Sequence, residues 1–459
     1  VSAFYTQLTD SPLARVHMFI STTPGQIPEY DVREIEQAIT KITNLWTDSL
    51  REELIAEHGE KLGERLLHTF RDAFPDSFID KYDANSAVAD IDKMQLLRKK
   101  PLELDLYRKA KEEDGLYHLK VYTTELNYPL SDMIPILENM GCKVIDVTPF
   151  TISPNWRSSD VLIRDFEISL RQPIEDFAAA KPLFEEALSR VWNGSMEDDD
   201  FNALVLCAGL EWRQIVILRA YAHYMKQMNF PYSTSYIADA LRAHPKVASL
   251  LAHMFLTKFN PDLSAKKRSG YMDYIKELHT YLDQVSNLAE DRIFRRFADL
   301  IQATVRTNYF QKGDADGVKS YLCFKFLSGK IPELPLPHPF AEIFVYSLRT
   351  EGIHLRGDKV ARGGLRWSDR LEDFRTEVLG LMKAQMVKNA VIVPQGSKGG
   401  FVVKQPPSDG SREAFLEEGI ACYKQFLSGL LDVTDNIKGD QVVPPERVVR
   451  YDDDDPYLV

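Results

Sequence analysis

The sequence predicts a multidomain protein of the α/β and α+β classes. Three observations lead to this prediction: a compact β-α-β-β pattern between residues 117 and 168, an almost entirely helical stretch from Pro173 to about Tyr309, and alternating strands and helices after Pro332. At about 150 residues per domain, the length of 459 residues corresponds to roughly three domains. We therefore expect several separate structural parts along one chain.

The N-terminal region, residues 1–115, is predicted to contain a strand followed by helices. Residues 13–21 alternate in part between apolar and polar side chains, which predicts a strand. From Asp31 to about Phe70, apolar residues recur at steps of three and four, which indicates a helix. A mostly helical stretch is predicted from Ala84 to about Ala110, with an interruption at Pro101.

A compact β-α-β-β module is predicted for residues 116–171. Ser131 is the expected N-cap of its helix, and Gly141 is the expected stop. The predicted elements, in order, are strand 117–123, helix 130–140, strand 143–147 and strand 161–168.

Residues 172–331 are predicted to form a helical region, and residues 332–459 an α/β domain. One apolar stripe of the helical region contains Phe177, Phe184, Leu188 and Val191, and another runs from Ile293 to Thr304. Four prolines between Pro332 and Pro339 predict a stiff connector. After it we expect strands 342–347 and 352–356, helix 371–389 with Asp369 as its cap, strand 390–393, a glycine-rich turn 396–400, strand 401–404, helix 411–431, and loop and strand over 442–459.

Composition excludes several classes of protein. A net charge of -12 argues against a chain that wraps nucleic acid. The sequence contains no run of 18 apolar residues, so it predicts no membrane span. The four cysteines have no spacing suited to zinc, so we expect no metal site and free, buried thiols in the cytoplasm. The apolar ending from Pro456 to Val459 follows an acidic run as a strand cut short would, so we expect a fragment of a longer protein.

Residues 361–404 contain the side chains best suited to chemistry. Gln385 and Lys388 are three residues apart, so they share a helix face. Lys398 lies among glycines in Gly396-Ser397-Lys398-Gly399-Gly400, where close backbone would partly desolvate its ammonium group. Gly363 and Gly364 would let a ligand approach the backbone closely. With Arg362, this set of cations and one amide suits a small dicarboxylate.

Structural interpretations remain open for the same features. The segment Gly396–Gly400 is also compatible with a phosphate-binding nest or a tight turn, although the GxxxxGK[ST] pattern is absent. Lys388, near a helix C-terminus, would also offset the helix dipole. The acidic run Asp452–Asp455 fits a solvated loop, with cation chelation as the alternative.

Three motifs follow one another in this region: Arg362-Gly363-Gly364-Leu365-Arg366, Gln385-Met386-Val387-Lys388-Asn389 and Gly396-Ser397-Lys398-Gly399-Gly400. Their order and spacing resemble those of the amino-acid dehydrogenase superfamily, and specifically the large bacterial NAD-specific glutamate dehydrogenases. The resemblance extends to Trp367–Arg370, Glu372–Val378, Glu290–Arg292 and Arg306–Phe310. It covers most of the chain and is most specific between about 290 and 404.

The resemblance implies a role for each candidate residue. Lys398 corresponds to the family's catalytic lysine, and Lys388 and Gln385 to the groups that hold the substrate α-carboxylate. Arg362 stands where the small enzymes have a lysine that meets the side-chain carboxylate, and its guanidinium fork can bind a carboxylate bidentately. Gly363 and Gly364 belong to the same substrate-binding motif. Residues 332–459 would then be a truncated substrate domain of the amino-acid dehydrogenase type.

The resemblance also implies what other parts contribute. No GxGxxG follows a strand in this sequence, so NAD would be bound mainly by a domain beyond this chain. The family's catalytic aspartate would follow shortly after Val459, and the fragment alone is expected to be inactive. The β-α-β-β module resembles an ACT-type regulatory module, in which Asn127–Asp132 would be the loop for an amino-acid effector; a purely structural or assembly role remains open.

The implied activity of the intact protein is oxidative deamination of L-glutamate to 2-oxoglutarate and ammonia with NAD, in a homo-oligomer. One alternative is a dehydrogenase of another amino acid, such as leucine or phenylalanine, which would need an apolar pocket instead of Arg362. A second alternative is an amino-acid sensor or assembly scaffold in which the module at 116–171 is the functional part.

Overall fold

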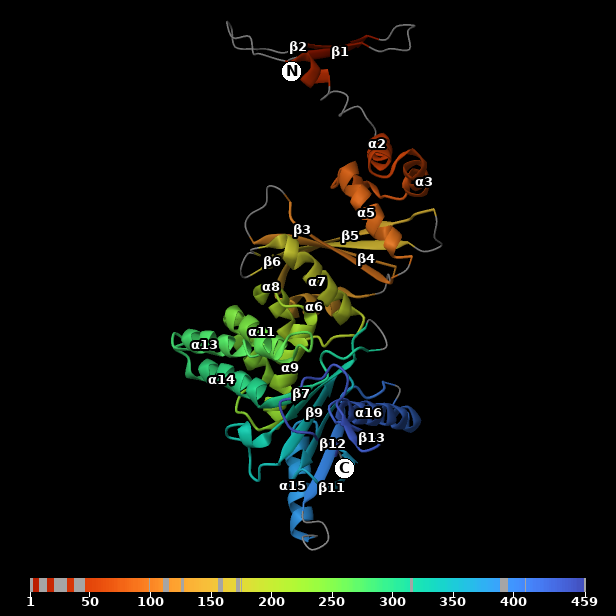
Figure 1. The fold of residues 1–459 in the computed structure, drawn as a ribbon. Coiled ribbons are helices and arrows are strands. Elements are labelled where there is room, and N and C mark those ends of the chain that lie inside the picture. Colours follow the sequence, from red (N-terminus) through yellow and green to blue (C-terminus); the bar gives the residue numbers. More distant parts are fainter. Residues whose placement is uncertain are drawn as a thin grey trace. The chain divides into compact units, whose positions relative to one another are not determined.

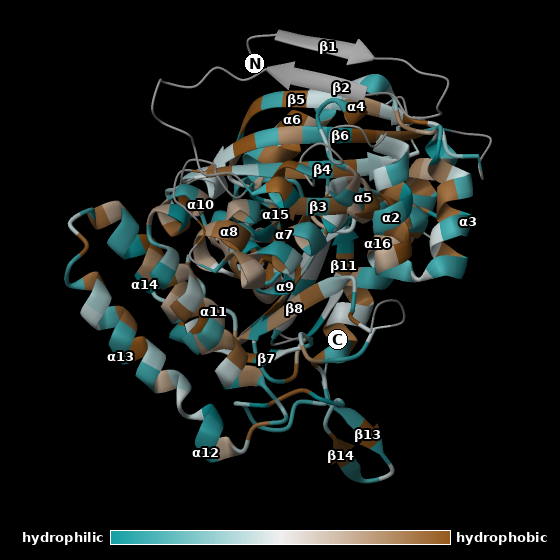
Figure 2. Ribbon diagram, turned by 90° about the horizontal axis from the view of Figure 1, so that it is seen from above, coloured by the Kyte–Doolittle hydropathy of each residue, from teal (hydrophilic) through white to brown (hydrophobic). Residues whose placement is uncertain are grey.

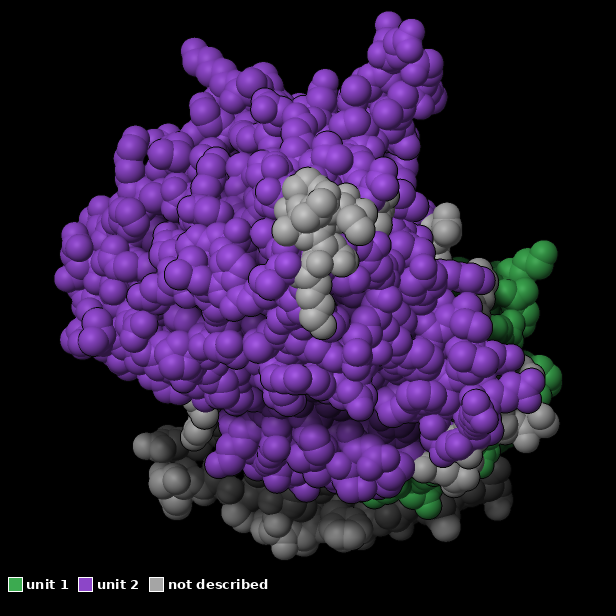
Figure 3. All heavy atoms as spheres, turned by 90° about the horizontal axis from the view of Figure 1, so that it is seen from below, with its two compact units in different colours: residues 1–98, 150–161 green, residues 99–149, 162–459 purple. Residues whose placement is uncertain are grey.

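The computed structural model describes residues 3–7, 15–19, 31–36 and 46–457, apart from 99, 110–114, 125–127, 156–159, 171–173, 175, 314–316, 389–394 and 409. For residues 3–7, 15–19 and 388, the description covers the backbone alone. The chain divides into two compact units, 1–98 with 150–161 and 99–149 with 162–459, which Figure 3 colours separately.

The first unit consists of a small hairpin and a set of short helices. Strands β1 (Ala3–Gln7) and β2 (Arg15–Phe19) pair antiparallel, which confirms the strand predicted at 13–21. The helices are α2 (Trp46–His58), α3 (Glu60–Phe70), α4 (Asp76–Ile79) and α5 (Ala84–Leu96). The single helix predicted from Asp31 to Phe70 is wrong at Gly59, whose positive φ of 77° ends α2 and begins α3.

A four-stranded antiparallel sheet contributes most of its residues to the second unit, while residues 150–152 and 161 belong to the first. Its elements are β3 (Leu102–Tyr107), β4 (Leu116–Thr123), α6 (Leu130–Asn139), β5 (Cys142–Ile152) and β6 (Val161–Leu170), and the strand order is β3-β4-β6-β5. The predicted β-α-β-β pattern is confirmed, and Gly141 ends the helix with a φ of 87°. Ser131 is not the cap, because α6 is preceded by Pro129. The helical prediction is wrong over β3, where Leu102, Leu104 and Leu106 are buried at the two-residue period of a strand.

The predicted helical region is confirmed as far as Ala303. Its elements are α7 (Phe177–Trp192), the 3-10 turn η1 (Asp200–Ala203), α8 (Leu204–Ala208), α9 (Trp212–Gln227), α10 (Thr234–Ala243), α11 (Pro245–Phe259), α12 (Ala265–Arg268), α13 (Tyr271–Leu282) and α14 (Leu288–Ala303). Figure 2 shows hydrophobic and hydrophilic residues interleaved along α13 and α14, as in helices with one buried face. Thr304, placed at the end of a helical stripe by the sequence pattern, instead begins a strand.

A six-stranded mixed sheet forms the C-terminal part of this unit. Its strands are β7 (Thr304–Thr307), β8 (Tyr321–Phe326), β9 (Ala341–Ser347), β10 (Thr350–Arg356), β11 (Arg362–Trp367) and β12 (Gly396–Val403), in the order β11-β12-β10-β9-β8-β7. All neighbours are antiparallel except β11 and β12, which are parallel. Strands β7, β8 and β11 were not predicted from the sequence, whereas β9 and β10 confirm the prediction.

Helices cover both faces of this sheet. On one face, Tyr224 of α9 stacks on Phe326, with ring centroids 4.4 Å apart. On the other face lies α16 (Arg412–Asp432), whose Phe426 leaves no room for a side chain at Gly352. The bounds of α16 confirm the helix predicted at 411–431, and Ser411 is its N-cap. Helix α15 (Phe374–Lys388) lies beside β11 and β12 in Figure 1.

The glycine-rich segment 396–400 is a strand, and the turn predicted there is wrong. It belongs to β12, which runs between β11 and β10. A Cβ at Gly399 would lie 2.4 Å from Leu365, and one at Gly400 would lie 2.6 Å from Val378 of α15. A side chain at either position would have to displace Leu365 or Val378, so these glycines let neighbouring side chains pack directly against the strand. The strand predicted at 390–393 lies outside the described residues.

Three smaller outcomes concern helix starts, thiols and membranes. Helix α15 begins at Phe374, so Asp369 lies too far upstream to be its cap. All four cysteines are free: Cys142, Cys323 and Cys422 are buried, and Cys207 is half-buried. In the described part of the chain, no helix is both long enough and apolar enough to cross a membrane. The short elements η2 (Ser328–Lys330), β13 (Asn436–Lys438) and β14 (Gln441–Val443) complete the fold.

Candidate active site

The parallel pairing of β11 with β12 brings two of the predicted motifs together. Arg362 lies opposite Gly396, and Gly364 lies opposite Lys398. Successive side chains of a strand point to opposite faces, so Arg362, Gly364 and Lys398 share one face of the sheet. A Cβ at Gly364 would lie 4.0 Å from Lys398 Nζ, which places the ammonium group directly over this glycine.

The two glycines of the Arg362 motif have different surroundings. A Cβ at Gly363 would lie 1.4 Å from the carbonyl oxygen of Ser397, so no side chain fits there without moving a strand. At Gly364, the nearest atom to such a Cβ is Lys398 Nζ, at ordinary contact distance. Gly363 therefore has a structural reason to be glycine, whereas Gly364 leaves space beside the lysine.

Helix α15 adds the third motif to the same place. The side-chain amide of Gln385 donates a hydrogen bond to the carbonyl oxygen of Arg362, with an N–O distance of 2.6 Å. The amide oxygen of Gln385 is buried and accepts no hydrogen bond within the described residues. A Cβ at Gly396 would lie 3.0 Å from that oxygen, so the amide lies between α15 and β12. Lys388 is the last residue of α15, and its side chain lies outside the described atoms.

Lys398 and Arg362 differ in exposure. Lys398 is half-buried, which agrees with the expected partial desolvation, and Arg362 is exposed. Neighbouring Arg366 pairs with Glu377 of α15 at 3.0 Å, and Ser368 donates to the same carboxylate at 2.5 Å. These two contacts fix β11 to α15 through residues that the motifs did not single out as site residues.

A buried ion pair holds the start of α15 against the sheet. Arg375 donates to both carboxylate oxygens of Glu342 on β9, at 2.9 and 2.6 Å. Tyr224 of α9 donates to the same carboxylate at 2.9 Å, and burial raises the pKa of its hydroxyl well above the usual value. Sequence reasoning missed this anchor, because Glu342 and Arg375 are 33 residues apart and nothing in the sequence pairs the two charges.

Two residues of the acidic run near the C-terminus, Asp452 and Asp455, form ion pairs with cations of the sheet. The interpretation of the run as a solvated loop is therefore wrong for these two residues. Asp455 is buried and pairs with Arg356 of β10 and Lys325 of β8, the latter at 2.7 Å. Asp452 pairs with Lys325 at 2.5 Å and with Arg306 at 2.6 Å. Burial alone would raise the pKa of Asp455, but Arg356 and Lys325 lower it to about 2.

His354 lies beside this network on β10, opposite Gly399. Its side chain is buried, and both ring nitrogens are without hydrogen-bond partners in the described part of the chain. Burial, reinforced by the charge of Arg356, lowers the pKa of His354 to about 3. The imidazole is therefore neutral at pH 7. In the described residues, no group of three or more His, Cys, Asp or Glu side chains is arranged to hold a metal ion.

The described residues do not form a dinucleotide-binding site of the doubly wound type. Such a site requires a parallel sheet with a glycine-rich turn between a strand and a helix. Within the described sheet of six strands, β11 and β12 are the one parallel pair. The geometry instead places two cationic residues, Arg362 and Lys398, on one face of the sheet beside Gly364.

Five family descriptions match successive parts of the chain. "Bacterial NAD-glutamate dehydrogenase, catalytic domain" matches residues 277–459, and "Glutamate dehydrogenase, helical motif 3" matches 196–261. The ACT3 domain of glutamate dehydrogenase matches 101–181, which contains the four-stranded sheet. Helical motif 2 and the ACT2 domain match 53–97 and 1–47.

Three curated relatives align with nearly the whole chain. They are the NAD-specific glutamate dehydrogenases of Halomonas elongata, Pseudomonas aeruginosa and Mycobacterium tuberculosis, at 45%, 42% and 39% identity. Each alignment covers 99% of this chain but only 28%, 28% and 29% of the respective relative. The chain thus spans less than a third of the length of these relatives.

Proposed function

We propose, from the membership of this chain in the bacterial NAD-glutamate dehydrogenase family, that the protein to which it belongs oxidatively deaminates L-glutamate to 2-oxoglutarate and ammonia with NAD. The observation that carries this proposal is the register of β11 on β12, in which Gly364 lies opposite Lys398 and Arg362 opposite Gly396. This register brings a lysine and an arginine close to glycines that have no side chain. A small dicarboxylate needs such cations to bind its two carboxylates.

The proposed roles follow the chemistry of each side chain. Lys398, half-buried over Gly364, stabilises the attacking water and the oxygen that becomes negative in the carbinolamine at C2. Lys388 and Gln385 hold the α-carboxylate, and Arg362 binds the side-chain carboxylate. Gly363 and Gly364 complete the substrate surface.

The role of this chain in the reaction is to bind and orient the substrate. Fixing both carboxylates of glutamate leaves C2 in one position relative to Lys398, which lowers the entropic cost of reaction. NAD, the cofactor named for the relatives, would accept hydride in a part of the protein other than the described residues, since these lack the parallel sheet that such a site needs.

We further propose that the six-stranded sheet with α15 and α16 is a substrate domain of the amino-acid dehydrogenase type. It would follow the helical region of α7 to α14, the ACT-like module of β3 to β6, and the N-terminal region. The protein would be cytoplasmic and would act as a homo-oligomer. The effector loop proposed for the ACT-like module lies partly outside the described residues, and Tyr128 within it stacks on Trp192 with ring centroids 4.3 Å apart.

Isothermal titration of the 459-residue chain with 2-oxoglutarate tests substrate binding without NAD. The proposal predicts binding that Lys388→Ala weakens, while Lys383→Ala, which removes an exposed lysine of the same helix, leaves it unchanged. Equal binding by all three proteins would contradict the proposed site. If amino acids bind while 2-oxoglutarate does not, the sensor alternative would be supported instead.

A further inference from the structure

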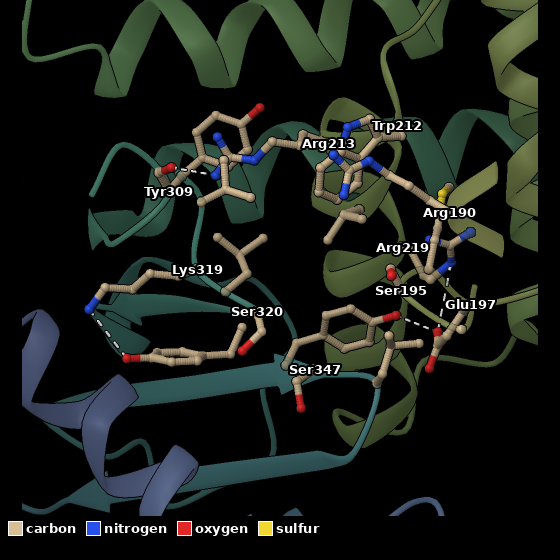
Figure 4. A pocket seen from close by; sticks show the side chains of 18 residues that line it. Arg190, Ser195, Glu197, Trp212, Arg213, Arg219, Tyr309, Lys319, Ser320 and Ser347 are labelled. Atoms are coloured by element: carbon tan, nitrogen blue, oxygen red, sulfur yellow. Dashed lines mark hydrogen bonds and ion pairs between the residues drawn. The ribbon is translucent and has the colours of Figure 1, made fainter. Parts of the chain in front are cut away.

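A cavity of about 320 Å³ in the same unit lies apart from the candidate active site. Its wall is formed by α7, α9, the start of β8 and the β9–β10 hairpin (Figure 4). None of its lining residues belongs to β11, β12 or α15. A ligand in this cavity would therefore not occupy the space beside Lys398.

Among the described residues that line the cavity, Arg213 is a cation without a carboxylate in ion-pair contact. Arg213, at the start of α9, donates a hydrogen bond to the carbonyl oxygen of Tyr309 at 2.7 Å. Its guanidinium group lies over the Tyr309 ring, 4.2 Å from the centroid. The guanidinium forms no ion pair with any described carboxylate; burial lowers its pKa, and the charge of Glu211 opposes this shift from a longer distance. Most of its five N–H donors remain available for an anion.

Other cations around the cavity have their charges compensated. Arg219 is fully buried and binds both oxygens of Asp199 at 2.7 Å, and Lys319 pairs with Asp432 at 2.6 Å. Arg190 pairs with Glu186 at 3.1 Å and lies over the indole ring of Trp212, 4.0 Å from the centroid. Arg213 therefore differs from its neighbours in having no described carboxylate within ion-pair distance, with Glu211 acting on it only from further away.

The remaining wall near Arg213 is suited to an apolar group. Trp212 and Tyr309 contribute aromatic rings, and Val216, Val318 and Leu322 contribute aliphatic side chains. Figure 4 shows Arg213 with Trp212 and Tyr309 along one side of the cavity, opposite Ser320 and Ser347. An anion bound at Arg213 would thus have its non-polar part against rings and methyl groups rather than water.

We propose that this cavity is a binding site for a small organic monocarboxylate, with the carboxylate on Arg213 and an apolar or aromatic body against Trp212, Val216 and Val318. The site is separate from the proposed glutamate site and does not depend on the proposed activity. It gives this chain a second ligand position, at the junction between the helical region and the six-stranded sheet.

Titration of the 459-residue chain with phenylacetate, and with its neutral analogue phenylacetamide, tests the proposal. The two probes have nearly the same shape, so their difference reports the carboxylate. We expect phenylacetate to bind about 10- to 100-fold more tightly, the range for a charge-assisted hydrogen bond. Arg213→Gln should abolish this preference, and Arg213→Lys should keep most of it because the charge remains.

Two controls separate this site from general charge effects and from the glutamate site. Arg295→Gln removes an exposed guanidinium that pairs with Asp291 on α14, and should leave phenylacetate binding unchanged. Lys398→Ala should also leave it unchanged, whatever it does to 2-oxoglutarate. Equal affinity for both probes in the unaltered chain, no binding of phenylacetate, or undiminished preference in a folded Arg213→Gln variant would each overturn the proposal.

Discussion

Gly364 and Lys398 lie side by side in the parallel strands β11 and β12, and a Cβ at position 364 would be 4.0 Å from the lysine Nζ. The preceding Gly363 differs, because a Cβ there would lie 1.4 Å from the carbonyl oxygen of Ser397. Two adjacent glycines of one motif therefore have different reasons to lack a side chain: one permits the strands to pair, and the other leaves space next to a cation.

This difference predicts opposite effects of two alanine substitutions. Gly363→Ala should lower the free energy of unfolding by about 1–3 kcal/mol or more, because the strands must separate to admit the methyl group. Gly364→Ala should leave stability nearly unchanged but raise KM for glutamate in the full-length protein on the order of tenfold, or about 1.4 kcal/mol. Urea unfolding and steady-state kinetics measure the two effects, and similar stability losses in both variants would contradict this assignment.

Arg362 should determine selectivity for a second carboxylate. In the full-length protein, Arg362→Leu is expected to reduce kcat/KM for glutamate about 10- to 100-fold, since a charge-assisted contact contributes about 1.5–3 kcal/mol. Norvaline, which lacks the side-chain carboxylate, should lose much less. Steady-state kinetics with both substrates make the comparison, and equal losses would show that Arg362 does not contact that carboxylate.

Asp455 should stabilise the fold through its two buried cations. Asp455→Asn leaves Arg356 and Lys325 undercompensated and should cost about 3–5 kcal/mol of unfolding free energy. Asp454→Asn, which disturbs only an exposed pair with Arg450, should cost less than about 1 kcal/mol. Urea unfolding at pH 7 compares the variants.

The same carboxylate predicts a pH dependence. Its pKa in the folded chain is about 2, below the ordinary value of 3.8, so its contribution is fully present above about pH 4 and is lost as the pH falls through 2. Unfolding free energies of the unaltered chain and Asp455→Asn should therefore converge between pH 4 and 2. A difference that stays constant over this range would show that the Asp455 charge is not the cause.

His354 predicts that the stability of the fold depends on pH in a higher range than Asp455 does. Its folded-state pKa of about 3 lies below the ordinary 6.5, so only the unfolded chain takes up the proton between these values. Stability should fall as the pH is lowered from 6.5, by about 1.4 kcal/mol per pH unit, or about 2 kcal/mol by pH 5. His354→Leu should remove this part of the decrease, while His253→Gln, at an exposed position, should not. The comparison is made by urea unfolding at pH 7 and 5.

The sequence predicted the elements whose patterns are local and missed those defined by distant neighbours. The helix at 411–431 has a strong cap in Ser411, and strands 342–347 and 352–356 have clear apolar patterns. By contrast, β11 and the glycine-rich start of β12 contain few apolar side chains, because α15 and adjacent strands occupy the space around their glycines. Periodicity cannot report such packing, so a turn was predicted where a strand lies.

The candidate site was predictable as a set of motifs but not as a geometry. The motifs identified Arg362, Gln385 and Lys398, and strand pairing brings their segments together. The Arg375–Glu342 anchor and the pairing of Asp455 with Arg356 were not predictable, since each joins charges far apart in sequence. The absence of an ion pair at Arg213 was missed for a similar reason, since it depends on how α9 lies against the Tyr309 loop, whose carbonyl oxygen accepts the Arg213 hydrogen bond.

The most direct test of the proposed active site is the kinetic comparison of Lys398→Ala and Lys388→Ala in the full-length protein. If Lys398 stabilises charge that develops at C2, its loss should reduce kcat by several powers of ten with little change in KM. Loss of Lys388 should act mainly on KM, because the α-carboxylate is present in the ground state and the transition state alike. A kcat within a few fold of normal for Lys398→Ala, or the reversed pattern between the two lysines, would contradict the proposed mechanism.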